Sequence, residues 1–276
     1  MLYFVSTPIG NLKDISYRAV EVLSSVDVIA CEDTRTSLKL LNRYDIKKRL
    51  VAYHKFNEKT ECEKIIAMIE DGLNVAVISD AGTPLVSDPG NALAKELHAR
   101  GIPYTVVPGA TAFTSALLLS GLDSDRFSFI GFLPEKKNEA EKLLEPYINL
   151  PSTLIFYSAP HDLKKTISRL YEILGDREAA IVKEITKIHE EVIRTTLCAA
   201  AEKYADGGLK GEIVLIIAGA KPEEKEQMAV EQAVEEAKKF IASGDSASEA
   251  AKKAAKLSGH KKGDIYKLLQ GEKDNG

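Results

Sequence analysis

Short apolar runs recur along the first part of the chain, and amphipathic or polar segments separate them. The runs span residues 2–5, 26–30, 50–53, 75–78 and 104–107. Their length and β-branched residues are typical of buried strands. Helical patterns follow them over residues 16–25, 37–44, 60–70, 91–100 and 112–120. Strands that alternate with helices predict a mostly parallel sheet with helices on both faces.

From residue 127 onwards, the apolar runs follow one another more closely. They span residues 127–132, 153–158, 179–185, 192–196 and 212–218, with helical patterns over 136–147 and 163–174. Strands that lie close together in sequence favour antiparallel pairs, so this part predicts a mixed sheet. A boundary near residues 120–126 then separates two α/β domains, residues 1–120 and residues 121–220.

A charged helical appendage, residues 221–276, follows the second domain. Helices are predicted over residues 223–242, from Ser246 to about residue 257, and over residues 262–269. Ser246 and Glu249 form a capping box, and the last two helices resemble a helix-turn-helix unit. Residues 252–267 contain six lysines and one acid. These lysines form either a solvated helical face or a patch that contacts phosphates.

Three of the predicted strands end in loops of small, polar and turn-forming residues. These loops span residues 6–11, 79–90 and 108–112. In open α/β sheets, ligands bind beyond the carboxyl ends of the strands. Gly82 lets the backbone approach a ligand closely, and Pro84 fixes the shape of its loop. One such loop is compatible with an ordinary strand-to-helix connection, but three together favour a ligand site.

A fourth polar cluster, residues 31–36, follows the second predicted strand and contains two acids and an arginine. Asp33 or Thr34 is suited to cap the next helix. Acids and an arginine at the carboxyl end of a strand are also suited to contact a substrate. The sequence leaves both interpretations open.

Composition narrows the class of protein. The 276-residue chain is 45% hydrophobic and 28% charged, with a formal net charge of −4. This balance predicts a soluble protein, in which any nucleic-acid surface is a local basic patch. Three cysteines without a CxxC pair predict reduced thiols and no metal site. No signal-peptide pattern and no run of about 20 apolar residues is found, so we expect a cytoplasmic protein without a membrane segment.

Eight segments resemble one family of bacterial enzymes and occur in the expected order. They read MLYFVSTPIGNLKDIS, ACEDTRTSLKLL, YHKFNE, VISDAGTPLVSDPG, VVPGATA, FIGFLP, IFYSAPH and KEITKIHEE. They are similar to the ribosomal RNA small subunit methyltransferase I family, which methylates the ribose 2′-oxygen of a 16S rRNA cytidine. That family has the tetrapyrrole methylase-like, class III S-adenosylmethionine-dependent fold. The resemblance covers about residues 1–270.

The resemblance implies two α/β domains of the tetrapyrrole methylase type, with the methyl donor S-adenosylmethionine in the cleft between them. It also implies a homodimer that acts on 16S rRNA in the small ribosomal subunit. The donor-site residues that it implies are Pro8, Asp80, Ala81, Gly82, Thr83, Pro84, Val86, Thr111, Ala112, Tyr157, Gly211 and Glu212. Residues 6–12 lack the glycine-rich loop of the tetrapyrrole methylases, and this departure argues against a porphyrin-type substrate.

Methyl transfer from a sulfonium is an in-line displacement that needs no metal. A ribose 2′-hydroxyl must lose its proton during transfer, and a general base contributes roughly 10²–10⁴-fold. Candidate bases are Asp80, Glu184, His189 and Glu190, and Lys183 or Lys187 is suited to stabilise an oxyanion or a phosphate. We favour Lys183 and Glu184 as the catalytic pair because they end an apolar strand of the second domain, although the sequence leaves the choice open.

A single-stranded or splayed RNA segment is the expected substrate. The candidates to contact it are Arg35, His54, Lys55, Phe56 and Arg194, with Phe56 or Tyr53 stacking on a base.

Three other functions are compatible with parts of the sequence. A methyltransferase for tetrapyrroles or protein side chains is disfavoured by residues 6–12 and by the lysines of 252–267. A non-enzymatic RNA-binding assembly factor is weakly disfavoured by the intact loops at 80–84 and 108–112. A nucleotide-binding dehydrogenase is disfavoured because no GxGxxG follows the first strand.

Overall fold

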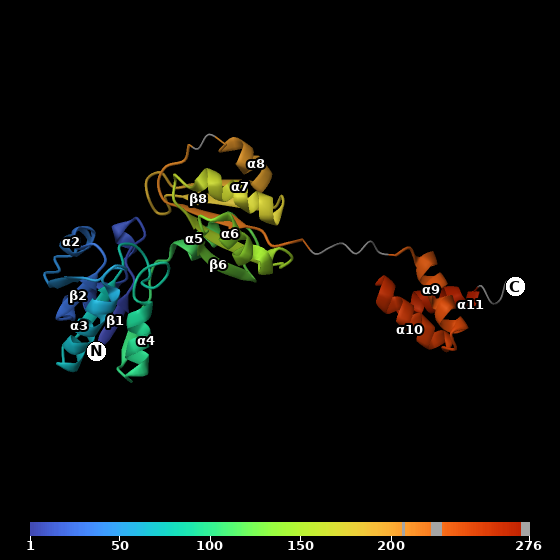
Figure 1. The fold of residues 1–276 in the computed structure, drawn as a ribbon, viewed down its shortest axis with the longest axis horizontal. Helices are drawn as coiled ribbons and strands as arrows, with labels where there is room; N and C mark the ends of the chain where they lie inside the picture. The colour runs from blue at the N-terminus through green and yellow to red at the C-terminus, as the bar shows by residue number, and fades with distance from the viewer. Residues whose placement is uncertain (206–207, 222–227, 272–276) are drawn as a thin grey trace. The chain divides into compact units, whose positions relative to one another are not determined.

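The computed structural model describes residues 1–205, 208–221 and 228–271. The chain divides into two compact units, residues 1–220 and residues 221–276. Figure 1 shows the two sheets of the first unit, coloured blue to teal and green to orange, and the helices of the second unit in orange and red. This division falls at the Gly219–Pro222 break in the sequence pattern.

The first sheet is fully parallel, as the alternating pattern predicted. Its strands lie in the order β3-β2-β4-β1-β5, which differs from their order in sequence. Their bounds are β1 Leu2–Val5, β2 Val28–Cys31, β3 Arg49–Ala52, β4 Val75–Ile78 and β5 Tyr104–Val107. The spatial order makes β4, β1 and β5 neighbours, and these are the three strands that end in the predicted ligand loops.

Helices cover both faces of this sheet. On one face lie α1 (Tyr17–Ser25) and α2 (Thr34–Arg43), and on the other lie α3 (Glu58–Glu70) and α4 (Asn91–Ala99). Within β4, alternate residues pack toward opposite faces, so the strand is a continuous apolar run. Helix α2 begins three residues before the predicted start, because the Asp33 side chain accepts a hydrogen bond from the backbone N–H of Arg35 and caps it.

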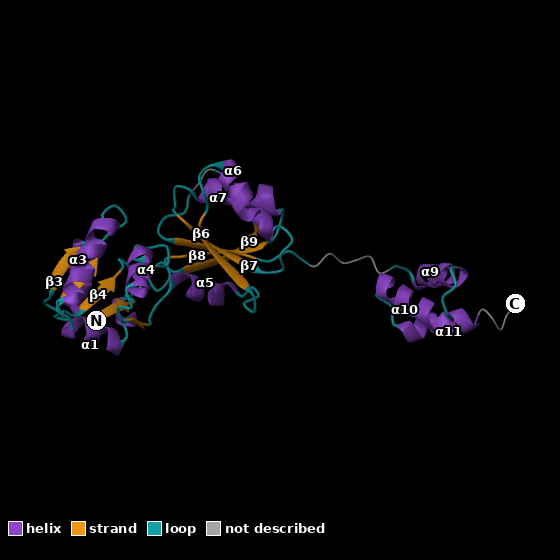
Figure 2. Ribbon diagram, turned by 60° about the horizontal axis from the view of Figure 1, so that its bottom comes forward, coloured by secondary structure: helices purple, strands orange, loops and turns teal. Residues whose placement is uncertain are grey.

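The second sheet is mixed, also as predicted. Its order is β6-β7-β10-β8-β9, with only β6 and β7 parallel. The bounds are β6 Phe127–Phe132, β7 Thr153–Ser158, β8 Glu178–Lys183, β9 Glu191–Thr196 and β10 Ile213–Ile217. One face carries α6 (Lys137–Leu144), α7 (Leu163–Leu174) and α8 (Leu197–Lys203). Figure 2 shows α5 (Ala112–Ser120) on the opposite face from α6 and α7. Helix α8, which the sequence pattern missed, has only seven residues.

Helix α5 (Ala112–Ser120) packs against the second sheet, although the predicted boundary places it in the first domain. Its Ala116 and Leu117 belong to the same apolar core as Ile155 and Val214 of the second sheet. The guanidinium of Arg194 in β9 donates hydrogen bonds to the carbonyls of Leu119 and Ser120. The start of α5 therefore meets the loops of the first sheet, while its body belongs to the packing of the second.

Residues 228–271 form a separate small core. Helices α9 (Val230–Ala242), α10 (Ala247–Ser258) and α11 (Lys262–Gly271) pack through alanines and a few larger residues. Ser246 caps α10 by accepting from the N–H of Glu249, and Gly259 ends it in a left-handed conformation, as predicted. Residues 223–227 of the predicted first helix lie outside the described residues. Within the described ranges, no helix is long and apolar enough to cross a membrane.

Candidate functional site

The loops that follow β1, β4 and β5 meet because their strands are neighbours in the sheet. The backbones of Thr7 and Gly82 exchange two hydrogen bonds, with N···O distances of 2.8 and 3.1 Å. Gly82 adopts φ +84°, and a Cβ there would lie 3.2 Å from Cγ2 of Ile9. A side chain at position 82 would therefore be strained and crowded, which explains glycine at this close approach.

The hydroxyl of Thr83 joins the three loops. It donates to the carbonyl of Ala110 at 3.2 Å. Its oxygen also lies 3.0 Å from the hydroxyl of Ser6 and 2.8 Å from that of Thr111. Because Thr111 immediately precedes α5, this cluster fixes the start of α5 against the first sheet.

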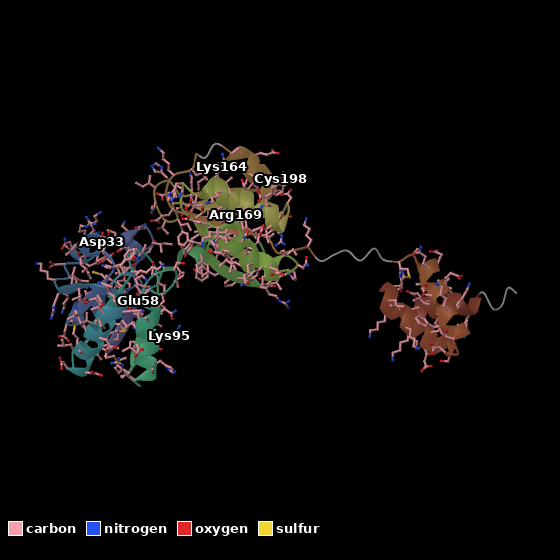
Figure 3. All side chains as sticks on the ribbon, in the orientation of Figure 1. Asp33, Glu58, Lys95, Lys164, Arg169 and Cys198 are labelled. Carbon is pink, nitrogen blue, oxygen red and sulfur yellow. The ribbon has the colours of Figure 1, made fainter. Side chains whose placement is uncertain are left out.

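The segment after Pro84 has a strained backbone that directs Val86 and Asp88 into a cavity. Leu85 and Ser87 have φ of +72° and +69°, a conformation that costs non-glycine residues roughly 1–3 kcal/mol each. Glu58 fixes the end of the segment, since its Oε1 accepts from the N–H of Gly90 at 2.9 Å and from that of Ala92 at 3.3 Å. Glu58 and Asp33 are both labelled on the first α/β domain in Figure 3.

Aromatic side chains of the second domain form the facing wall. The ring of Tyr157 packs edge-on against Phe129 and Phe132, with centroid separations of 5.0 and 5.7 Å. Burial raises the pKa of Tyr157 to about 12, so its hydroxyl is protonated at neutral pH. A bulge in β6 brings Gly131 to the Ser87 side of the cleft, where a Cβ would lie 3.4 Å from Oγ of Ser87.

Gly211 and Glu212, just before β10, complete the wall. The carboxylate of Glu184 accepts from the N–H of Glu212 at 2.8 Å, and Nζ of Lys187 bridges the carboxylates of Glu184 and Glu212. Gly211 adopts φ +89° beside the Glu184 side chain. Glu184 itself has φ +52°. These contacts hold the backbone of residues 211–212 against the cavity.

Together these segments enclose a cavity of about 370 Å³ between the two α/β domains, called here the interdomain cavity. Its walls are largely apolar, and its charged lining residues are Asp88 and Glu212, both acids. The residues that line it are Ile9, Ala81, Gly82, Thr83, Val86, Ser87, Asp88, Thr111, Ala112, Phe132, Tyr157, Ser158, Ala159, Pro160, Gly211, Glu212, Ile213 and Val214. Such a cavity suits a partly apolar ligand that carries positive charge.

Most residues that the resemblance assigned to the methyl donor lie in this wall. The structure places there Ala81, Gly82, Thr83, Val86, Thr111, Ala112, Tyr157, Gly211 and Glu212. Pro8, Asp80 and Pro84 flank lining residues without lining the cavity themselves. Asp80 instead accepts a hydrogen bond from the backbone N–H of Asp33 at 3.0 Å and so ties the β2 and β4 loops together.

Asp88 is the functional candidate that sequence reasoning missed. Burial, followed by the nearby charge of Glu32, raises the pKa of Asp88 to about 6. Burial and the charge of Asp80 also raise the pKa of Glu32. The signal was present in the sequence, because Asp88 lies within the second turn cluster of the 79–90 loop, but nothing there shows that its side chain is partly buried at a cavity.

The two residues predicted to be catalytic lie near the cavity without lining it. Nζ of Lys183 forms an ion pair with Glu191 at 2.7 Å. The N–H of Glu212 and the ammonium of Lys187 lower the pKa of Glu184, so its carboxylate is a weaker base than an ordinary glutamate. Both residues are therefore engaged in contacts that position the 183–191 segment.

The residues predicted to contact RNA separate into buried and exposed groups. Tyr53 is 1% exposed, and its hydroxyl donates to Glu58, which makes it a core residue. Arg194 is engaged with the end of α5. Arg35 forms an ion pair with Asp33. Phe56 is 97% exposed, with His54 beside its ring, so it is the aromatic side chain of this group that is free to stack.

Among the described residues, no group of three or more His, Cys, Asp or Glu side chains is placed to hold a metal ion. In the same part of the chain, Cys31, Cys62 and Cys198 are free thiols.

Solved structures share the fold of this chain. The methyltransferase CobJ superposes with a TM-score of 0.63 at 18% identity, over 79% of this chain and 94% of that chain. Uroporphyrin-III C-methyl transferase from Thermus thermophilus, complexed with S-adenyl homocysteine, superposes with a TM-score of 0.57 at 20% identity, over 79% of this chain and 96% of that chain. At these identities, the likeness establishes the fold.

Sequence similarity identifies the family as well as the fold. Residues 1–201 match the family Tetrapyrrole (Corrin/Porphyrin) Methylases. Ribosomal RNA small subunit methyltransferase I from Halalkalibacterium halodurans is 42% identical over 98% of this chain and 95% of that protein. The protein of the same name from Mesorhizobium japonicum is 44% identical over 99% of this chain and 92% of that protein. The chain therefore belongs to the ribosomal RNA small subunit methyltransferase I family of the tetrapyrrole methylases.

Proposed function

We propose that this protein transfers the methyl group of S-adenosylmethionine to the ribose 2′-hydroxyl of a cytidine in 16S rRNA of the small ribosomal subunit. The observation that carries the proposal is the near full-length identity of about 42–44% to ribosomal RNA small subunit methyltransferase I proteins. The interdomain cavity supports it, because the segments that resemble the donor site of the family converge there.

The interdomain cavity fits S-adenosylmethionine in size and charge. A volume of about 370 Å³ lies within the range of small-molecule sites, roughly 300–1,000 Å³. The apolar and aromatic walls suit the adenine ring, and the acids Asp88 and Glu212 suit a cationic ligand. When bound, S-adenosylmethionine supplies an electrophilic methyl group. The protein must then align the acceptor hydroxyl within about 3–3.5 Å and remove its proton.

We propose Asp88 as the general base that accepts this proton. Its carboxyl group lines the cavity, and its pKa of about 6 leaves it ionised at neutral pH yet more basic than an ordinary aspartate. Lys183 and Glu184 remain the candidates from the sequence. In the structure, Glu184 holds the N–H of Glu212, which supports a positioning role for it.

The lysines of the C-terminal unit are proposed to hold ribosomal RNA outside the reaction centre. Lys253 pairs with Asp245, and Lys262 donates to Ser248. Within the described residues, no ion pair engages the four exposed lysines at positions 252, 256, 261 and 267. Such lysines are suited to contact phosphates.

Replacing these four lysines with glutamine in the full chain is expected to weaken binding to small-subunit RNA. The slope of log K against log salt should become shallower by up to about 0.7–0.9 per lost phosphate contact, while donor affinity stays unchanged. Filter binding at several salt concentrations measures this slope. The control variant replaces Lys238 and Lys239, which pair with Glu235 and Glu236. An unaltered slope in the fourfold variant would contradict the proposed role.

The experiment that tests the proposed function is methylation of small ribosomal subunits that lack this modification. The purified protein is incubated with labelled S-adenosylmethionine, and the label is mapped by nuclease digestion and mass spectrometry. One 2′-O-methylcytidine in 16S rRNA is the expected product. Donor binding without label on RNA would refute the proposal and favour another acceptor. The homodimer and the cytoplasmic location expected from the sequence remain predictions.

A further inference from the structure

A second cavity lies next to the interdomain cavity, and its charge is opposite. It has a volume of about 600 Å³ and is called here the basic cavity. Lys13, Arg43 and Lys187 contribute cationic groups to its lining, with Glu184 as the carboxylate and His189 and Ile188 beside them. The cations come from three separate segments: the 3₁₀ turn η1 (Leu12–Asp14), the end of α2 and the β8–β9 loop.

The basic cavity has a fixed shape because the loops on its two sides interlock. The N–H of Asn11 donates to Oγ1 of Thr186 at 2.9 Å. A Cβ at Gly10 would lie 2.6 Å from the same hydroxyl oxygen, so the loops approach as closely as glycine allows. Glu184 and Thr186 hold left-handed φ angles of +52° and +64°, which locates the turn of the β8–β9 loop. Strained residues that the surroundings hold in place are typical of functional sites.

The carboxylate of Glu184 in the basic cavity does not neutralise the positive charges of Lys13 and Arg43. Glu184 already binds Lys187 and the N–H of Glu212. Among the described residues, no carboxylate forms an ion pair with Lys13 or Arg43. Both side chains are exposed to solvent, so they are available to an anionic ligand.

The two cavities share a wall. Ile9 lines the interdomain cavity and Gly10 the basic cavity, while Glu212 lines the former and pairs with Lys187 of the latter. An acid-lined cavity thus adjoins a cavity with three cationic side chains. A cationic methyl donor and a polyanionic acceptor would need this arrangement.

We infer that the basic cavity binds the phosphodiester backbone of the substrate RNA beside the reactive ribose, through Lys13 and Arg43. This inference rests on the proposed function, because it names the subsite that receives the acceptor strand. Arginine suits the site because its guanidinium bonds two phosphate oxygens at once, and lysine adds a mobile point charge. The side chain of Ile188, 96% exposed at the rim, offers an apolar contact for a sugar or base.

The test compares the full-length protein with the double variant Lys13→Ala/Arg43→Ala, with small ribosomal subunits as substrate. The variant is expected to bind subunits about 10–100-fold more weakly, and its salt slope should be shallower by about 1.4–1.8, corresponding to two phosphate contacts. Donor affinity, measured in the absence of subunits, should match the wild type because neither side chain lines the interdomain cavity. The matched control, Arg126→Ala/Lys142→Ala, removes equal charge from the residue before β6 and from α6 of the second domain, and should leave the slope unchanged.

A charge-conserving variant, Lys13→Arg/Arg43→Lys, separates charge from packing. It is expected to keep most of the wild-type salt slope. An equal loss of slope in this variant and in the alanine variant would overturn the inference, as would wild-type binding by the alanine variant. Failure of the proposed function is a different result: the wild-type protein would then place no methyl group on the subunits, whatever the variants bind.

Discussion

Replacing Asp88 with asparagine is expected to lower turnover by about 10²–10⁴-fold at saturating donor and RNA, which is the usual contribution of a general base. Asparagine keeps the size and polarity of the side chain but cannot accept the 2′-hydroxyl proton. Donor affinity should fall much less than turnover, because Asp88→Asn removes one of the two acids that suit the cationic donor but leaves the remaining wall of the interdomain cavity unchanged. Single-turnover methylation, with donor affinity measured separately by calorimetry, checks both statements.

The pH dependence of the wild-type protein should report the same group. Because burial raises the pKa of Asp88 to about 6, the carboxyl group is protonated and inactive below that pH. Turnover should therefore rise as pH increases through about 6 and then level, and the rise should be absent from Asp88→Asn. Glu32 and Asp80 are the neighbouring acids that help raise this pKa. Replacing Glu32 with glutamine should shift the rise to lower pH.

Stability should depend on the pH in the opposite sense. The folded protein binds a proton on Asp88 more tightly than the unfolded chain does. The stabilisation that this proton provides is therefore fully present below the pKa that Asp88 has in the unfolded chain. This contribution is lost as pH rises through about 6, and Asp88→Asn should remove that loss.

The variant Glu184→Gln tests the general base that the sequence favoured. A large turnover defect there, with normal turnover in Asp88→Asn, would assign the base to Glu184.

Replacing Gly211 with alanine is expected to reduce donor affinity by at least about tenfold. The new Cβ would overlap the carboxylate of Glu184, with Cγ of Glu184 only 2.7 Å away. Glu184 would have to move, and the N–H of Glu212 would lose its partner. Because residues 211–212 line the interdomain cavity, their displacement should weaken donor binding, which calorimetric titration with S-adenosylmethionine measures.

The control for this substitution is Gly72→Ala. Gly72 has φ +88°, nearly that of Gly211, but a Cβ there would meet nothing within 4 Å. Both variants should lose about 1–2 kcal/mol of unfolding free energy from the left-handed backbone, measured by urea denaturation. Only Gly211→Ala should lose donor affinity. Equal donor affinities in the two variants would show that Glu184 does not hold the cavity wall.

The local pattern of the sequence was enough to predict most elements of the fold. Buried parallel strands must be apolar on both faces, so the runs at 2–5 and 75–78 were visible as β1 and β4. Ser246 and Glu249 marked the start of α10, because capping uses residues that are neighbours in sequence. The family motifs identified the loops of the interdomain cavity, since ligand loops keep particular residue types at fixed spacing.

The position of α5 and the roles of several charged residues depended on tertiary contacts. A helix rich in alanine and leucine packs equally well on either sheet, and its contact with Ile155 and Val214 depends on residues far away in sequence. Arg194 was expected to contact RNA, but it binds the end of α5 across 74–75 residues of sequence.

The sequence by itself determined most of the strands and helices, the mixed and parallel sheets, the family and the loops at the site. Only the tertiary structure decided which acids lie in the interdomain cavity and which hold its wall. A carboxylate's pKa depends on burial and on neighbouring charges, and both are set by segments distant along the chain. For this reason Asp88 became a candidate base, and Lys13 and Arg43 came together beside the acid-lined cavity, only once the chain was folded.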